Sequence, residues 1–456
     1  MRIQATILQT PAPGTLQVLE EHVVTVDDDG WITTLEPAGH VPDAGPDGAG
    51  VDVRLPAGVV LIPGLVDTHL HAPQWPQLGT GLDLPLEEWL MVHTFPLEAR
   101  FADVAFARRV WDDMVPSLLA NGTTTAVYYG SIHEPATVDL AAACLTYGQR
   151  ALVGRVAMDH PDTTPEWYRD PGARAGVEAS ARSIEAIRAL AGGGPGGAGR
   201  DGGQVLVRPI ITPRFIPACS DALLHGLGEL AAETGVTIQT HCSESDWEHA
   251  DVFDRCRRSD AAALERFGLI GPHTVLAHAT HVDDDDRALV ASAGAGVAHC
   301  PLSNVYFSER IFAVRAALAA GLRVGLGTDI AGGPEPSVLA QCGHAVGVSR
   351  QLSRSTESAV AVGNAGPVSS VGIDMTTAFW LATAGGAELT GLPVGLLEPG
   401  RAFDAVAVNL GSGGLGLWNE AGDWPPLFEK LVRLSGPAHM TDVWVAGRRV
   451  AGTGPD

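Results

Sequence analysis

The chain has 456 residues, of which 45% are hydrophobic and only 18% charged, and its formal net charge is −24. This length exceeds one minimal domain and accommodates a barrel with a smaller appended unit. The apolar content excludes a disordered chain, and the negative charge argues against a nucleic-acid partner, whose phosphates require a basic surface. No apolar run reaches the ~18 residues of a transmembrane helix, and the first residues lack the pattern of a signal peptide. We therefore expect no membrane association and a cytoplasmic location.

Both ends of the chain carry short Val-rich and Ala-rich runs that are bounded by proline or glycine, and such runs predict strands. The runs are Ile3–Leu8, Leu16–Val26, Trp31–Leu35, Asp404–Asn409 and Asp442–Val450. Because the two ends share this character, we expect one small β-sandwich domain that is formed by residues 1–57 and 396–456.

Between these ends, strand-length apolar runs alternate with longer stretches of helical spacing such as Phe106–Ala120. The eight runs are Leu61–Thr68, Thr123–Gly130, Ala151–Asp159, Val205–Pro213, Thr237–Thr240, Thr274–Ala277, Gly296–His299 and Val324–Gly327. Eight strand-then-helix units predict an α/β fold, a (β/α)8 TIM-like barrel over residues 58–395, with its active site at the carboxyl ends of the strands. The glycine-rich stretch Ala191–Gly203 is expected to be a surface connection without a function.

Metal-binding residue types follow several of these runs. The first run leads into His69 and His71, and the alternation of a strand places two such imidazoles on one face. His241 after the fifth run and Asp329 after the eighth would add a third nitrogen and a carboxylate oxygen. This set leaves an open position for water, which is the layout of a catalytic zinc site. Zinc is the preferred metal for these donors, although iron or manganese would also fit.

The number of metal ions follows from the single lysine in the sequence, Lys430, which lies near the C-terminus. Some barrel hydrolases bridge two metals with a carboxylated lysine on a strand of the barrel. The predicted barrel contains no lysine, so we expect one metal ion per subunit. The six cysteines form no CxxC pair and are expected to be free, buried thiols.

Two further residues are candidates for proton transfer. Glu244, three residues after His241, can take a proton from water and return it to a leaving nitrogen. Alternatively, it is a carboxylate in the first turn of a helix, where the helix dipole favours it. His278 ends the sixth run, where it either packs in the core or orients the attacking water. Asp329 would serve both as a metal ligand and as a proton acceptor.

Several motifs resemble the amidohydrolase superfamily and, more closely, its guanine deaminases. They are Pro63–Gln74, Leu82–Leu90, Thr94–Pro96, Asn121–Thr125, Thr212–Phe215 and Gly325–Asp329. The resemblance extends from about residue 60 to residue 410 and is weaker at both ends.

The resemblance implies zinc-dependent hydrolysis of guanine to xanthine and ammonia by a homodimer. The metal ligands carried over by motif are His69, His71, His241 and Asp329, and the catalytic residues are Glu244, His278 and Asp329. The purine would be bound by Gln74, Arg214 and Phe215, with His241 beside it. A glutamine amide can both donate and accept along the edge of a heterocycle, and Arg214 can donate to the ring carbonyl.

One segment departs from the family pattern. After Cys300-Pro301 the residues Val305–Arg310 are bulkier and more charged than usual, and they follow a strand that would border the substrate. The alternative function is therefore deamination of a related amino-heterocycle, namely 8-oxoguanine, a pterin or a triazine, at the same single-metal site. A third possibility is a scaffold without catalysis. Such proteins generally lose metal ligands, and here all of them are present.

Overall fold

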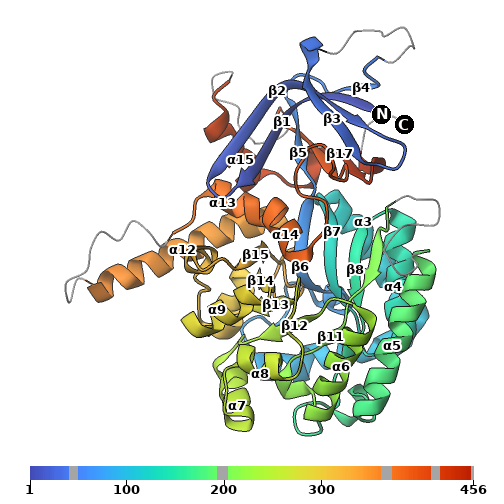
Figure 1. Cartoon of the computed structure of the whole chain (residues 1–456), viewed down its shortest axis with the longest axis vertical. Coiled ribbons are helices and arrows are strands. Elements are labelled where there is room, and N and C mark those ends of the chain that lie inside the picture. The colour runs from blue at the N-terminus through green and yellow to red at the C-terminus, as the bar shows by residue number, and fades with distance from the viewer. Residues whose placement is uncertain (41–49, 193–203, 361–371, 412–421, 453–456) are drawn as a thin grey trace.

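The computed structural model describes residues 1–40, 50–192, 204–360, 372–411 and 422–452. Figure 1 shows a β-rich unit that carries both chain ends and a larger α/β body below it. The predicted glycine-rich connection falls mostly outside the described residues. Within them, all six cysteines are free thiols and five are buried, with Cys256 half-buried, so the prediction of free thiols is confirmed. No helix in the described ranges has the length and apolar character that crossing a bilayer requires.

Strands from both ends of the chain form one eight-stranded sheet in the order β18-β17-β16-β5-β1-β2-β3, with β4 paired to β1. The strands are β1 Arg2–Ala12, β2 Thr15–Val26, β3 Ile32–Pro37, β4 Val53–Arg54, β5 Val59–Pro63, β16 Ala405–Asn409, β17 Met440–Val445 and β18 Arg448–Gly452. Antiparallel pairing of β5 with β16 joins the two ends of the chain. The expected β-sandwich is not confirmed, because the described terminal strands lie in a single sheet.

The larger body contains two four-stranded parallel sheets, in the orders β10-β8-β7-β6 and β12-β13-β14-β15. These strands are β6 Leu65–His71, β7 Thr123–Tyr129, β8 Arg150–Gly154, β10 Val207–Pro209, β12 Gln239–Cys242, β13 Val275–His278, β14 Gly296–His299 and β15 Arg323–Leu326. A short parallel pair, β9 Val156–Ala157 and β11 Thr212–Pro213, lies beside them. Each predicted run overlaps one of the eight main strands, which confirms the α/β alternation.

The two parallel sheets approach each other at both edges. At one edge Ile211 forms an isolated parallel bridge with Ile238. At the other, the Asp329 amide donates to the His69 carbonyl at 2.8 Å, and the Thr68 hydroxyl donates to the Leu326 carbonyl at 2.8 Å. The described strands nevertheless do not form one continuous ladder of eight.

The first predicted run, Leu61–Thr68, is divided between the two units. Its beginning belongs to β5 in the terminal sheet and its end to β6 in the parallel sheet. Gly64 separates the strands, and a Cβ atom at this position would lie only 2.1 Å from the Thr124 hydroxyl oxygen. Glycine therefore permits the close approach of the chain to β7 at the change of sheet.

Helices follow most parallel strands and cover them, as Figure 1 shows for α3 to α6 on one side of the body. The α-helices are α1 Leu86–Trp89, α2 Phe95–Ala99, α3 Val104–Ala120, α4 Glu134–Tyr147, α5 Ala173–Leu190, α6 Asp221–Thr234, α7 Asp246–Cys256, α8 Asp260–Arg266, α9 Asp284–Ser292, α10 Pro301–Ser303, α11 Val314–Ala319, α12 Val338–Val360, α13 Met375–Trp380, α14 Gly386–Thr390 and α15 Trp424–Leu434. Helix α6 shows how the sequence sets these ends: the Ser220 hydroxyl accepts the Leu223 amide, and Gly235 ends the helix at φ +65°.

A buried ion pair connects the parallel sheet to the terminal sheet. Arg150 of β8 donates to Asp404 from Nε at 2.8 Å and from Nη2 at 3.0 Å, and Asp404 also accepts the Ala446 amide. We expect Asp404→Asn to lower the free energy of unfolding by about 3–5 kcal/mol, because the guanidinium stays buried without its counter-charge. Urea titration measures this loss. The control Arg108→Gln breaks an exposed pair with Asp139 and should cost less than about 1 kcal/mol; equal losses in both variants would contradict the expectation.

Candidate active site and metal centre

Strand β6 presents alternate side chains to one face and is buried along its whole length. Asp67 accepts the amide and the hydroxyl of Thr328, at 3.0 and 2.5 Å, so its carboxylate connects β6 to the segment after β15. The next two alternate residues are His69 and His71, whose rings meet edge to face with centroids 5.0 Å apart. Asp67 therefore supports the strand, and the two histidines are left to face the site.

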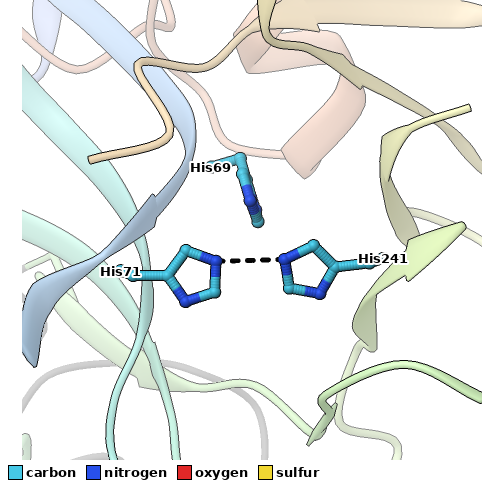
Figure 2. Close-up of side chains that lie close together, drawn as sticks. All are labelled: His69, His71 and His241. Carbon is cyan, nitrogen blue, oxygen red and sulfur yellow. Dashed lines mark hydrogen bonds between the residues drawn. The ribbon is translucent and has the colours of Figure 1, made fainter. Parts of the chain in front are cut away.

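The predicted metal ligands converge at this point. His71 Nε2 lies 3.0 Å from Nε2 of His241, which comes from β12, and the edge of the His69 ring points between these two rings (Figure 2). Asp329 Oδ1, just after β15, lies 3.1 Å from His69 Nε2 and 3.6 Å from His71 Nε2. Residues separated by up to 260 positions in sequence thus form overlapping groups of donors that could hold a metal ion. The three imidazoles form one group, and His69 with His278 and Asp329 forms another.

These donors fit a metal ion. Burial lowers the pKa of His69, His71 and His241 well below the usual value, and the neighbouring imidazoles lower it further, so the rings are neutral and offer lone pairs. Neither ring nitrogen of the buried His69 makes a hydrogen bond with any described residue, despite the short distance to Asp329. Unpaired buried nitrogens are costly, and a shared cation would satisfy them. Nitrogen and carboxylate donors in this number are the set that zinc prefers.

A backbone contact sets the orientation of His241. Its Nδ1 lies 2.5 Å from the carbonyl oxygen of Arg214, and we assign the proton to Nδ1 because only a donor can pair with a carbonyl. The Nε2 lone pair then faces His71 and His69. Histidine ligands of metals are commonly fixed in this way by a hydrogen bond from the other nitrogen.

Glu244 and His278 lie beside the ligands. His278 Nδ1 pairs with the Asn304 amide oxygen at 2.9 Å, and its Nε2 lies 3.7 Å from a Glu244 oxygen and 3.9 Å from Asp329. Burial, together with the charge of Asp329, raises the pKa of Glu244 well above its usual value. These surroundings favour the protonated form of Glu244 more than water does.

Glu244 is not the first-turn carboxylate of a helix, which was the other possibility for this residue. Helix α7 begins at Asp246 with Ser245 as its cap, and Glu248 is the buried acid of its first turn. The Glu248 carboxylate accepts the Glu244 amide at 2.7 Å. This bond holds the backbone of Glu244 so that its side chain faces His278.

A cleft opens over the metal ligands, and the structure brings the predicted purine-binding residues into it. It is lined by His71, Gln74, Leu86, Trp89, Leu90, Arg214, Phe215, His241, Glu244, Phe307, Asp329 and Gly332. Every predicted site residue except the more deeply buried His69 and His278 contributes to the lining. Apolar walls with a few convergent polar groups are typical of a site for a small molecule.

The sequence did not single out Glu98 or the cleft-lining residues Leu86, Trp89, Leu90 and Gly332, and it included Phe307 only as part of the segment Val305–Arg310. The fully buried carboxylate of Glu98 accepts hydrogen bonds from Arg214, Gln74 and Tyr168. The sequence pointed to Glu98 only by its position two residues after the motif Thr94–Pro96. Phe307 lines the cleft and packs against Trp89 with centroids 5.1 Å apart. Because Phe307 belongs to the segment that departs from the family pattern, that departure borders the cleft.

Comparisons with known proteins identify the family of this chain. The amidohydrolase family model matches residues 60–450. A probable guanine deaminase of Schizosaccharomyces pombe is 38% identical over 86% of this chain and 71% of its own length. The guanine deaminase of Mus musculus is 32% identical over 95% of this chain and 93% of its own. The solved guanine deaminase of C. acetobutylicum, which has guanine bound in its active site, superposes with a TM-score of 0.86 at 26% identity, covering 98% of this chain and 99% of its own. The chain therefore belongs to the amidohydrolase family and, within it, to the guanine deaminases.

Proposed function

We propose that this protein hydrolyses guanine to xanthine and ammonia with one zinc ion per subunit. The observation that carries the proposal is one cleft that joins two sets of residues. His71, His241 and Asp329 bring metal donors to its base, and Gln74 and Arg214 bring purine-binding groups to its wall. A ring that contacts the polar wall would lie directly over the metal ligands.

The metal would be held by His69, His71, His241 and Asp329. When bound, a zinc ion lowers the pKa of a water molecule and so supplies a nucleophile near neutral pH. His278 faces the same space from the other side, with its Nδ1 occupied by Asn304. It is therefore placed to hold the attacking oxygen in line with the ring.

Proton transfer falls to the two carboxylates of the site. The oxygen of water bonds to C2 of the ring, the C2–amine bond breaks, and the amine leaves as ammonia. Asp329 would accept one proton of the water and pass it to the departing amine, which leaves as ammonia. Glu244 would deliver a proton to ring N3, where charge builds up during the attack, and would regain one from the oxygen that becomes the C2 carbonyl. The position of Glu244 in the lining of the cleft, 3.7 Å from His278 Nε2, supports this role.

The wall of the cleft would bind the purine by its edge and its face. Arg214 donates to the carbonyl oxygen at C6, Gln74 donates along the same edge, and Phe215 offers its ring to the heterocycle. The rings of Phe215 and His241 lie at 70° with centroids 6.2 Å apart. Phe215 therefore borders both the purine position and a metal ligand.

We also propose the finer architecture that the sequence predicts. The eight parallel strands would close into a (β/α)8 barrel, which is supported by the contacts between the two sheets at both edges. The division into residues 1–57, 58–395 and 396–456 and the homodimer remain part of this proposal. The molar mass of the protein in solution tests the dimer.

The decisive experiment is ammonia release by the purified, zinc-loaded protein on guanine, 8-oxoguanine, a pterin, adenine and cytosine. We expect guanine to be preferred, with adenine slower by about 10³-fold or more, because adenine has no amine at C2 to release and carries an amine at C6 in place of the oxygen that Arg214 would bind. Failure to release ammonia from any of these rings would overturn the proposal. Metal-dependent activity on another ring would favour the second candidate, a related amino-heterocycle deaminase, and the position of Phe307 in the cleft is the observation that supports it.

A further inference from the structure

Glu98 in α2 is a fully buried carboxylate that receives four hydrogen bonds. Arg214 donates to it from Nη1 at 2.7 Å and from Nη2 at 3.2 Å. Gln74 Nε2 donates at 2.8 Å and the Tyr168 hydroxyl at 2.9 Å. One carboxylate therefore holds both of the polar residues that face the purine position from the cleft wall.

These bonds leave Arg214 little freedom. Its guanidinium is held end-on by Glu98 and lies over the Phe95 ring, with the guanidinium carbon 4.9 Å from the ring centroid. Two of its five N–H donors are used on Glu98, so donors remain for a ligand in the cleft. Arg214 is thus a fixed donor beside the substrate.

The same carboxylate determines which way the Gln74 amide points. The amide oxygen of Gln74 accepts the Ala331 backbone N–H at 3.1 Å, while its nitrogen donates to Glu98. The second N–H of the amide remains available to the cleft. Since Glu98 can only accept, Gln74 presents a donor on this side, as Arg214 does.

We propose that Glu98 is a positioning residue that sets specificity for a purine with a carbonyl oxygen at C6, an inference that rests on the proposed function. Glu98 holds Arg214 and Gln74 as donors, and donors pair with a carbonyl oxygen but meet the hydrogens of an amine. A purine with an amine at C6 would leave the buried donors of Arg214 and Gln74 without acceptors. A polar site discriminates most strongly against a ligand that leaves its buried groups unpaired.

The test compares guanine with 2-aminopurine, which keeps the C2 amine and has hydrogen in place of the C6 oxygen. The zinc-loaded Glu98→Gln variant is assayed for kcat and KM on guanine, and 2-aminopurine is measured as a competitor of guanine. We expect the KM for guanine to rise about 10- to 100-fold, the cost of losing a well-placed bond to a charged group. The inhibition constant of 2-aminopurine should change by less than about 3-fold, because it makes no bond at C6.

Two further variants make the result specific. Asp404→Asn breaks the buried, two-bond pair with Arg150 described above. Asp404 is not among the residues that line the cleft, so both constants should stay unchanged. Tyr168→Phe removes one donor to Glu98 and should raise the KM for guanine several-fold without affecting 2-aminopurine. This second variant decides the matter if Glu98→Gln does not fold.

Equal changes for guanine and 2-aminopurine, or no change in either, would overturn the inference. Failure of the proposed function is seen separately, because it would appear as a wild-type protein that releases no ammonia from guanine.

Discussion

Replacing Glu244 with glutamine is expected to lower kcat for guanine by about 10³- to 10⁴-fold, the range in which general acid–base catalysis contributes. Glutamine keeps the size of the side chain and its place 3.7 Å from His278. It cannot accept and release a proton, so N3 of the ring would stay unprotonated when the amine leaves. Single-turnover ammonia release measures the effect, and metal analysis should find zinc bound as in the wild type.

Asp246→Asn provides the matched control for this variant. Asp246 lies two residues further along the chain, has a carboxyl side chain as well, and is exposed, where it pairs with Arg310. Turnover should remain within about 3-fold of the wild type, as for other exposed ion pairs of small energetic weight. If Glu244→Gln retained wild-type turnover, Glu244 would have no part in proton transfer. If it lost its zinc, Glu244 would have to be placed among the metal ligands.

The second large effect concerns His69. We expect His69→Ala to lower zinc affinity by more than about 100-fold, since even residues that only orient a ligand cost about 10- to 100-fold when removed. Activity should fall together with metal content. Metal analysis after dialysis against a chelator gives the affinity, and guanine turnover at saturating zinc shows whether added metal restores activity.

The matched control is His299→Ala. His299 is also a buried histidine at the end of a parallel strand, and its ring nitrogens make no hydrogen bond within the described residues. It is not among the groups that could share a metal ion. This variant should lose stability through the cavity that it creates but keep its zinc. An active, metal-free His69→Ala protein would contradict the proposed metal site.

The chemistry of the site could be predicted from the sequence because its signals are local. A strand alternates its faces, so the spacing of His69 and His71 is enough to place both imidazoles on one side of β6. A barrel gathers its strand ends, so His241 and Asp329 could be assigned to the same place from their positions after predicted strands. The structure brings these four side chains together.

The predicted β-sandwich is not confirmed, since the described terminal strands form one sheet, and pairing between distant strands has no local signal in the sequence. Leu61–Thr68 reads as one apolar run, yet its beginning pairs with β1 and β16 and its end with β7. Burial on both faces makes such strands equally apolar, so composition does not tell which sheet each half joins.

The sequence by itself predicted the α/β class, the residue types that gather at the candidate metal site and, through its single lysine, one metal ion. Tertiary structure alone decided which nitrogen of His241 faces the site, that Glu244 precedes its helix, and that Glu98 holds Arg214 and Gln74. The physical reason is separation along the chain. The periodic patterns of strands and helices involve residues that are near neighbours in sequence. Glu98 and Arg214 are 116 residues apart and meet only in the folded chain, where a buried charge must be paired.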